Sequence, residues 1–506
     1  MPVLNLRYSL SNRFVSISLI IAIVFYILAS YYLVYCLHHD EHFQIMEFAN
    51  YKRGLTPENR LAWEFKANLR PTLQPAIAFI LLNALHFAGI KDPFIQAMFF
   101  RLMSSCLFIF CSFQIYKAFK PELQSVFFNK VFLILSLFLY VFPITGTRFS
   151  SENLSSCFFV LGFVLLYNKY LKEDDENPGS SILFNAGLLF GISFLFRYQS
   201  AVLTFGLAAW LLVFRFRYIG KWLIMFTGFA VIFLIGILID RWFYGKWVFS
   251  ALNYLNFNLL EGKSANFGVA PWHFYITSVD YRKWLKILNI SIILIASLFL
   301  IIKPKHVISW IVYPFVLLHF IIAHKETRFL YPVYIYLPSI MVFTFQFVYN
   351  FNLKTRFPLI IFIYILMIIN SFAFFAATFS VHDNTIEIFK FIRKLPFKPV
   401  KIYYSNPLFF DPLNDDKNRL TPLFYKDKHV VAIEKVNIAN ESELHHLRVN
   451  PDTITFIMLD WEQQEILKPR LNVVFNPQSD FIKTINYRNW MKHSFSNWKL
   501  YQPDTK

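Results

Sequence analysis

The sequence contains little glycine and cysteine, and it lacks the glycine-rich loops that bind nucleotide phosphates. Only 14 of its 506 residues are glycine, and they form neither a Walker motif nor a dinucleotide fingerprint. This absence argues against a nucleotide-driven transporter. The 4 cysteines lie in or beside apolar segments without the spacing of metal ligands. We therefore predict neither a disulfide framework nor a cysteine-bound metal.

Acidic residues are also scarce. The chain carries 31 Asp and Glu against 49 Lys and Arg, which gives a formal net charge of +18. A nucleic-acid partner would explain such a charge, but the basic residues stand in short clusters between apolar runs, as in Arg215 to Lys221. Clusters of this kind anchor loops to anionic lipid headgroups. We therefore expect contact with a membrane and no nucleic-acid partner.

Long apolar runs dominate the rest of the chain. Hydrophobic residues make up 56% of it, the mean hydropathy is +0.45, and 62 Phe and 27 Tyr add side chains typical of lipid-facing helices. We expect an all-α polytopic membrane protein with about eleven transmembrane helices. The predicted spans are residues 14–36, 72–90, 94–116, 126–146, 152–168, 181–213, 220–239, 286–302, 306–323, 329–348 and 357–380. The stretch 181–213 is either one tilted helix or two short ones broken near Arg197.

Composition changes in three places along the chain. Residues 37–71 and 244–286 mix charged and aromatic side chains, which is typical of loops and short amphipathic helices in the membrane interface. Beyond residue 380 the apolar runs shorten, and strand-like segments occur at residues 400–404, 429–434, 453–459 and 472–475. We predict a transmembrane domain over residues 1–380 and a small soluble α/β domain over residues 381–506.

The most distinctive local pattern follows the first predicted span. The string from His38 to His42 places Asp40 and Glu41 among three histidines at the mouth of a helix. Partial loss of hydration makes a carboxylate a stronger base, so we predict catalysis by these two acids rather than an exposed helix end. Histidine and aspartate also bind divalent metals. Spacing alone is a weak indicator of a metal site, and we predict no metal ligand and no cofactor.

Basic residues within or between apolar runs form further candidates. The string from His324 to Arg328 contains a lysine and an arginine, which suit phosphate oxygens. The alternative is a positive-inside anchor, but an anchor does not need the histidine and the acid. Arg148 and Glu152 flank a break between two spans, where ionisable groups usually line a cavity. Arg197 is either a cavity residue or part of a loop between two short helices.

Taken in order, these segments resemble one enzyme family. It comprises the mannosyltransferases that use a lipid-phosphate-linked mannose, including those that extend the dolichol-linked oligosaccharide and the GPI-anchor core. The family's His-Pro-Asp-Glu-x-Phe-Gln string is similar to residues 38–44, with His39 in place of the proline. Other family motifs match at Trp63–Phe65, Arg70–Pro75, Asp240–Gly245, Asn253–Asn258, Pro271–Tyr275 and His324–Pro332. The resemblance covers residues 14–380.

The resemblance implies a C-type glycosyltransferase (GT-C) fold. It implies inverting transfer of mannose from a polyprenyl or dolichyl phosphate donor to a glycan or glycolipid acceptor, with Asp40 as the catalytic base and Glu41 beside it. As substrate-binding residues we predict His39, Gln44, Arg148, Glu152, His273, His324, Lys325 and Arg328. The active site is expected on the luminal side of the endoplasmic reticulum membrane or on the extracytoplasmic side of a bacterial inner membrane.

Two other functions are open at this point. A related GT-C enzyme would transfer another sugar, such as glucose or an aminoarabinose-like unit. A lipid or sugar transporter would use the acidic pair for proton coupling, but such acids more often lie at mid-membrane, and we find no inverted repeat. The tail beyond residue 380 carries no motif of the family, and it either shapes the acceptor entrance or is a docking surface.

Overall fold

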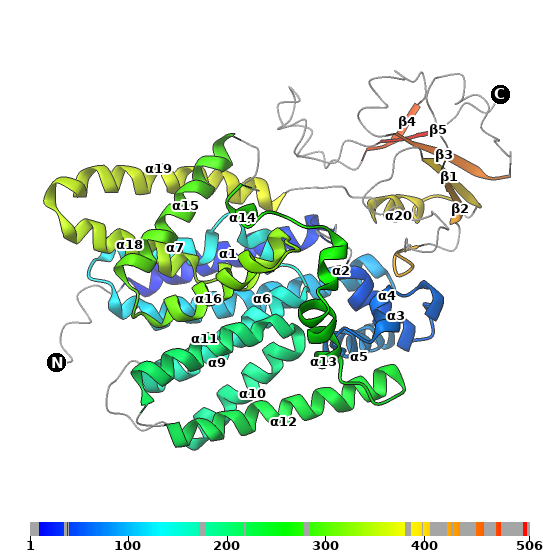
Figure 1. Ribbon diagram of the computed structural model, residues 1–506. Coiled ribbons are helices and arrows are strands. Elements are labelled where there is room, and N and C mark those ends of the chain that lie inside the picture. Colours follow the sequence, from blue (N-terminus) through cyan, green and yellow to red (C-terminus); the bar gives the residue numbers. More distant parts are fainter. Residues whose placement is uncertain are drawn as a thin grey trace. The chain divides into compact units, whose positions relative to one another are not determined.

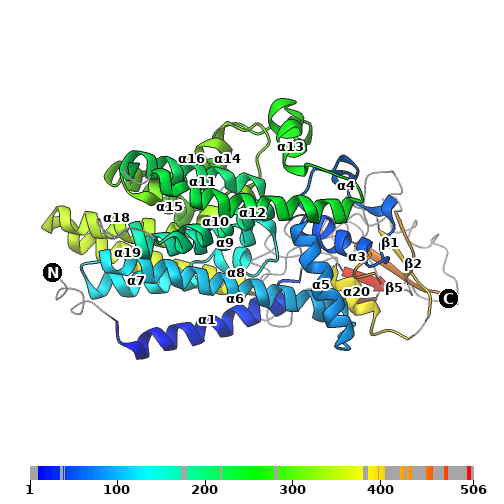
Figure 2. The same cartoon turned by 90° about the horizontal axis from the view of Figure 1, so that it is seen from below.

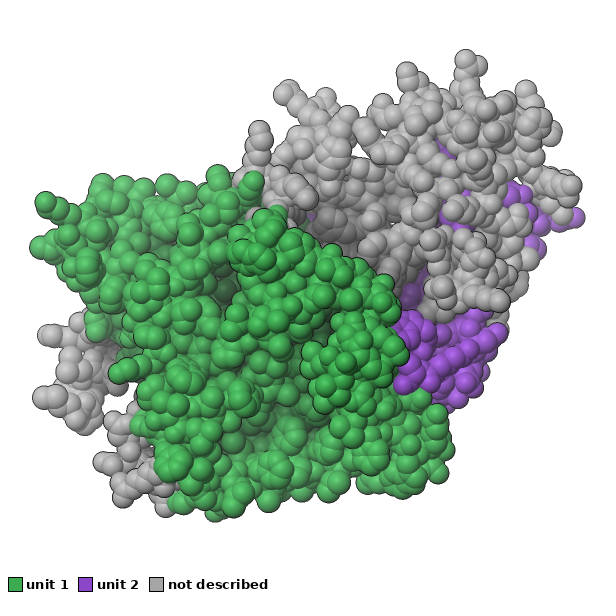
Figure 3. Space-filling view, viewed as in Figure 1, with its two compact units in different colours: residues 1–29, 68–74, 100–378 green, residues 30–67, 75–99, 379–506 purple. Residues whose placement is uncertain are grey.

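The computed structural model (Figures 1 and 2) describes most of the apolar region and parts of the tail. The described residues are 10–34, 38, 40–171, 179–216, 219–277, 283–379, 386–396, 398–404, 422–426, 430–435, 452–459, 472–476 and 499–502. The chain forms two compact units, which Figure 3 colours green and purple. Unit 1 comprises residues 1–29, 68–74 and 100–378, and unit 2 comprises residues 30–67, 75–99 and 379–506. Unit 2 joins segments from both sides of residue 380, and a domain boundary there stays a prediction.

Apolar helices make up most of the described residues. Five are long and apolar enough to cross a membrane: α1 (Asn12–Tyr32), α6 (Pro93–Phe119), α12 (Ile219–Tyr244), α15 (Lys283–Ile302) and α19 (Leu353–Thr378). A sixth span results if the bent pair Thr327–Tyr334 and Leu337–Phe351, the latter being α18, is counted as one. Shorter apolar helices are α5 (Leu73–Phe87), α7 (Val126–Phe138), α10 (Ser180–Phe196), α11 (Ala201–Phe214) and α16 (Val307–Ile321). The expected polytopic helical fold is confirmed, whereas the count of about eleven spans stays a prediction, since five or six of the described helices are long and apolar enough to cross a membrane.

Two of the predicted spans are interrupted. The stretch 181–213 is two helices, α10 and α11, and Arg197 between them has an extended backbone with φ −153° and ψ 116°. The expected span 126–146 also splits, because α7 ends at Phe138 and the short helix α8 (Phe142–Gly146) follows. After a further break, α9 (Ser151–Leu166) begins where the Ser150 hydroxyl accepts a hydrogen bond from the backbone N–H of Asn153.

Helix α12 shows what surrounds the apolar helices. Its side chains Leu223, Phe226 and Leu238 are 67%, 65% and 59% exposed. A continuous apolar face of this kind is unfavourable in water and is what a lipid-facing helix requires. The protein is therefore an integral membrane protein.

Helix α10 packs between α9 and α12, as both ribbon views show. Two glycines allow α10 and α12 to approach closely. A Cβ atom added to Gly187 would lie 2.0 Å from the carbonyl oxygen of Met225, and one added to Gly228 would lie 2.2 Å from that of Phe184. Since neither distance is possible without moving a backbone, the glycines set the spacing of this helix pair.

We expect Gly187→Val to separate α10 from α12 and to destabilise the protein by about 1–3 kcal/mol, as overpacking usually does. The measurement is the midpoint of thermal unfolding in detergent. Gly220→Ala is the matched control, because a Cβ at Gly220 meets nothing within 4 Å. An unchanged midpoint for Gly187→Val would show that the two helices are not in close contact.

The tail of unit 2 forms a mixed sheet. Among the described residues, its strand order is β2 (Val430–Lys435), β1 (Val400–Tyr404), β3 (Ile454–Leu459), β5 (Lys499–Gln502) and β4 (Asn472–Phe475). Strand β1 is parallel to β2 and β3, whereas β5 is antiparallel to β3 and β4. Helix α20 (Ile386–Ile392) packs on the sheet through Phe391, whose ring centre lies 5.8 Å from that of Phe456. The expected α/β fold of the tail is confirmed, and β5 is a strand that the sequence did not predict.

Candidate active site

Asp40 and Glu41 open a short helical segment of unit 2. This segment consists of α2 (Asp40–His42), a π-helical turn, η1 (Phe43–Glu47), and α3 (Phe48–Lys52). The Asp40 side chain is 21% exposed, and its Oδ1 lies 3.5 Å from Nδ1 of His38. Every residue from His42 to Asn50 is buried, whereas Asp40 and Glu41 are half-buried. At the start of the segment, the two carboxylates are thus open to solvent and to a substrate, as are Tyr51 and Lys52 at its end.

Buried polar contacts hold the segment in place. Nε2 of His42 lies 2.9 Å from Oε1 of Glu47, and the Thr56 hydroxyl donates to Oε2 of Glu47 at 2.5 Å. The Gln44 amide donates to Oε1 of Glu64 at 2.9 Å. Such contacts are strong because the surroundings exclude water. They rigidify the π-helical turn, a type of turn that is frequent at functional sites.

In unit 1, three arginines lie where helices are interrupted. Arg148 follows α8, Arg197 separates α10 from α11, and Arg328 belongs to a 3₁₀ turn, η9 (Thr327–Leu330). That turn continues into α17 (Tyr331–Tyr334), and the pair makes a bend of 65° with α18. The three arginines are only 5%, 5% and 7% exposed. Because buried charge in a membrane protein is costly, such residues usually line a cavity or bind a partner.

Two acids connect these interruptions. Nη1 of Arg197 lies 2.7 Å from Oε1 of Glu152, and Nη1 of Arg328 lies 3.6 Å from the same oxygen. Nε of Arg328 also donates to Glu326, whose Oε1 lies 2.9 Å from Nε2 of His324. Three predicted site residues, Glu152, His324 and Arg328, are thereby joined with Arg197 in one network.

A third chain segment is tied to this network. Nδ1 of His324 lies 3.0 Å from the carbonyl oxygen of Gly268, and the Lys325 ammonium donates to the carbonyl oxygen of Ala270 at 3.1 Å. Burial lowers the pKa of Lys325. The interfacial segment before His273 therefore lies against the residues that flank η9.

The composition of this region favours an anionic ligand. Six ionisable residues at or beside these interruptions are named the cation cluster: Arg148, Glu152, Arg197, Lys325, Glu326 and Arg328. Ion pairs join Glu152, Arg197, Glu326 and Arg328, whereas Lys325 belongs to the cluster by its place in the chain next to Glu326 and Arg148 by its place before α9. With four positive and two negative side chains, its formal charge is +2. Removing positive charge from water is costly, and phosphate oxygens that accept hydrogen bonds from guanidinium groups offset that cost.

A buried carboxylate, Asp240, organises the chain beside Arg197. Its Oδ1 accepts hydrogen bonds from the backbone N–H of Thr72 at 3.2 Å and from the Thr72 hydroxyl at 2.5 Å. Its Oδ2 accepts one from the Ser250 hydroxyl, which lies 2.6 Å from the hydroxyl of Tyr198. Asp240 thus links the end of α12 to the segment 68–74 and to the interruption that carries Arg197.

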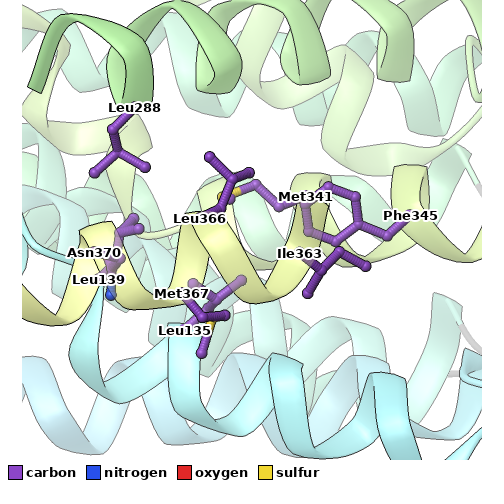
Figure 4. Close-up of a pocket in the computed structure, with 9 residues that line it drawn as sticks. All are labelled: Leu135, Leu139, Leu288, Met341, Phe345, Ile363, Leu366, Met367 and Asn370. Carbon is purple, nitrogen blue, oxygen red and sulfur yellow. The ribbon is translucent and has the colours of Figure 1, made fainter. Parts of the chain in front are cut away.

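The structure also contains a small apolar pocket among helices α7, α15, α18 and α19 (Figure 4). Its lining residues are Leu135, Leu139, Leu288, Met341, Phe345, Ile363, Leu366, Met367 and Asn370. Since none of these side chains is ionisable, the cavity offers neither a base nor a phosphate ligand. We do not assign the transfer chemistry to it.

The predicted site residues fall into three groups. Asp40, Glu41 and Gln44 belong to the short helical segment of unit 2 that comprises α2, η1 and α3, which we name the acidic segment. The Gln44 amide already donates a hydrogen bond to Glu64. In unit 1, the structure brings Glu152, His324 and Arg328 together, with Lys325 next to them in the chain and Arg148 at the bend before α9. His273 contacts Thr277, with its Nδ1 3.4 Å from that hydroxyl. His39 lies outside the described residues. The substrate-binding roles of all these residues stay predictions.

Sequence reasoning left the role of Arg197 open and did not identify the roles of His42, Glu47 and Asp240. Arg197 was assigned equally to a loop or a cavity, and its position in an apolar run was the available signal. His42 and Glu47 were not predicted as a pair, and Asp240 was not predicted as a hydrogen-bond acceptor. Within the described ranges, no group of three or more His, Cys, Asp or Glu side chains is placed to hold a metal ion. That the protein needs no cofactor stays a prediction.

The fold and these motifs define a membrane protein of the GT-C type. In a comparison with solved structures, ArnT from Cupriavidus metallidurans bound to undecaprenyl phosphate superposes with a TM-score of 0.53 at 9% identity, covering 98% of this chain and 99% of that one. The profile of the Alg9-like mannosyltransferase family matches residues 16–413. The chain belongs to the Alg9-like mannosyltransferase family.

Two relatives illustrate this membership. The chain is 27% identical over 307 residues to GPI mannosyltransferase 3 of Candida albicans, which covers 60% of this chain and 58% of the relative. It is 26% identical over 317 residues to GPI alpha-1,2-mannosyltransferase 3 of Mus musculus, which covers 60% of this chain and 53% of the relative. The chain thus spans a little over half the length of these relatives.

Proposed function

We propose that the protein transfers a mannosyl group from a polyprenyl or dolichyl phosphate donor to a hydroxyl of a glycan or glycolipid acceptor. Family membership supports the sugar and the reaction class. The observation that carries the choice of donor is the cation cluster, whose buried arginines suit a phosphate leaving group. The acidic segment supplies the second requirement, a carboxylate within reach of a substrate.

In the proposed reaction, the acceptor oxygen attacks the anomeric carbon and forms the new glycosidic bond. The bond between that carbon and the donor phosphate oxygen breaks, and its electron pair leaves with the lipid phosphate. Asp40 accepts the proton of the acceptor hydroxyl, and Glu41 beside it orients a substrate hydroxyl. Arg328 and Lys325 stabilise the charge of the departing phosphate. A single displacement of this kind inverts the anomeric configuration.

The names of the relatives support a more specific acceptor. Both relatives are named after a GPI acceptor, and the name of the mouse relative also gives an α-1,2 linkage. By this similarity, the proposed acceptor is a mannosylated glycosylphosphatidylinositol lipid and the proposed linkage is α-1,2. We place the reaction on the luminal side of the endoplasmic reticulum membrane, or on the extracytoplasmic side if the source is bacterial.

A donor comparison tests this proposal. Purified protein is given radiolabelled mannosyl-phosphoryl-polyprenol, the corresponding glucosyl lipid or a nucleotide-linked mannose, each with a mannosylated glycosylphosphatidylinositol as acceptor. We expect transfer from the mannosyl lipid, with a preference over the glucosyl lipid on the order of tenfold or more.

Rapid transfer from nucleotide-linked mannose in the absence of a lipid carrier would overturn the choice of donor. A preference for the glucosyl lipid would favour the related GT-C enzyme that moves another sugar. Movement of the lipid across vesicle membranes without sugar transfer would identify a transporter.

A further inference from the structure

A turn of the tail lies against the segment that carries Asp40 and Glu41. The turn spans Pro422–Lys426 and is closed by a hydrogen bond from the backbone N–H of Tyr425 to the carbonyl oxygen of Pro422 at 3.1 Å. It belongs to unit 2, as the acidic segment does. The family match ends at residue 413, so family membership assigns no role to this turn.

A buried hydrogen bond connects the turn to Glu47. The backbone N–H of Phe424 donates to Oε1 of Glu47 at 2.8 Å. The same oxygen lies 2.9 Å from Nε2 of His42, while the other carboxylate oxygen accepts from Thr56. Glu47 and His42 are each only 1% exposed. Because water cannot replace a lost donor at this depth, the tail supplies one of the groups that satisfy the Glu47 carboxylate.

Aromatic contacts reinforce this connection. The Tyr425 ring stacks on the His42 imidazole with ring centres 5.3 Å apart and an interplanar angle of 25°. The Phe424 ring lies 6.2 Å from the same imidazole, and Tyr425 also packs at 5.1 Å on Phe94. Phe424 and Tyr425 are 7% and 3% exposed. Both rings of the turn are therefore buried beside the histidine that follows Glu41.

The next residue of the turn, Lys426, is half-buried. Burial and the nearby charge of Arg60 lower the pKa of Lys426. Arg60 belongs to the loop after the first span, so a residue of the tail and a residue of that loop lie close together.

We propose that the Phe424–Tyr425 turn is a positioning element for the two carboxylates. It fixes the His42 ring and the Glu47 carboxylate, which lie at the last residue of α2 and the last residue of η1 in the helical segment that Asp40 opens. Since His42 follows Glu41 directly, contacts that hold its ring restrain the backbone of α2, which carries both carboxylates. The tail then contributes to the active site itself. This inference rests on the proposed function.

The test compares full-length variants with the mannosyl lipid donor and the glycosylphosphatidylinositol acceptor. A double variant, Phe424→Ala with Tyr425→Ala, should lower kcat roughly tenfold to 100-fold, because small displacements of catalytic groups have effects of this size. The donor KM should change less than about twofold, since neither ring belongs to the cation cluster. Tyr425→Phe, which keeps the stacked ring, should retain nearly normal kcat.

Phe475→Ala is the matched control. The Phe475 ring packs 4.8 Å from that of Phe391 within the tail, so its loss disturbs the tail without removing the rings on His42. If this control lowers kcat as much as the double variant does, the effect reflects general folding of the tail and the proposal is overturned.

Hydrogen–deuterium exchange gives a readout that does not depend on activity. The double variant should accelerate exchange of the backbone amides of residues 40–47, while Phe475→Ala leaves them protected. Unchanged protection together with unchanged kcat in the double variant would also overturn the proposal. If the wild-type protein shows no transfer, the proposed function fails, and the exchange experiment still decides whether the turn holds the acidic segment.

Discussion

Asp40→Asn is expected to reduce the rate of mannosyl transfer at least about 100-fold, the low end of what a general base contributes. The substitution keeps the size and the hydrogen-bonding capacity of the side chain but removes the oxygen that takes the acceptor proton. Expression and thermal stability in detergent should stay unchanged, because the side chain is partly exposed and does not pack in the core. Glu41→Gln should also be impaired, but less.

Glu58→Gln is the matched control for Asp40→Asn. Glu58 is an exposed acid of the same interfacial loop, so its neutralisation changes the local charge equally without touching the acidic segment. We expect normal turnover for this control. Near-normal turnover of Asp40→Asn would end the assignment of Asp40 as the base, whatever the control shows.

Arg328→Ala is expected to lower kcat/KM for the mannosyl lipid roughly 100-fold. A hydrogen-bonding group aimed at negative charge that develops in the transition state contributes about this much. Both kcat and the donor KM should suffer, while the acceptor KM changes little. Arg328→Lys should restore only part of the activity, since an ammonium keeps the charge but not the forked guanidinium geometry. Steady-state kinetics with each substrate varied in turn measure these effects.

Arg328 also pairs with Glu152 and Glu326, so its removal leaves two acids with one partner fewer. The midpoint of thermal unfolding of Arg328→Ala separates a loss of stability from a loss of phosphate binding. Arg328→Lys keeps a positive charge both for the two acids and for the donor phosphate. Arg241→Ala, which removes an exposed arginine of unit 1, is the matched control. An effect of Arg328→Ala confined to the acceptor KM would reverse the placement of the two substrates.

The helical fold was predictable because a helix that crosses the hydrocarbon core of a bilayer needs a long run of apolar residues, and such runs are visible in the sequence. Exact helix limits were less predictable where polar groups interrupt a run. The break at Arg197 was one of two alternatives, and tertiary contacts with Glu152 decide between them. Strand β5 escaped prediction because its four residues hold only two apolar side chains between a lysine and a glutamine, whereas the equally short β4 has three apolar residues in a row.

The motifs of the candidate site were predictable from the sequence, but the buried contacts that hold these motifs in place were not. Asp40, Glu41 and Arg328 stood out because ionisable groups beside apolar runs need a reason to be there. The contact between Glu47 and Phe424 joins residues 377 positions apart. No local pattern reports such a contact, and Glu47 looked like one charged residue among several in an amphipathic loop. The buried pairing of His42 with Glu47 is hidden for the same reason.

The anomeric configuration of the product tests the central claim most directly. Purified protein is supplied with a mannosyl-phosphoryl lipid of defined anomeric configuration, and the labelled product is digested with mannosidases specific for either anomer. A single displacement assisted by one base predicts that the product carries the configuration opposite to that of the donor. A product with the configuration of the donor would require a covalent intermediate or a different nucleophile, and it would contradict the role of Asp40 as the base.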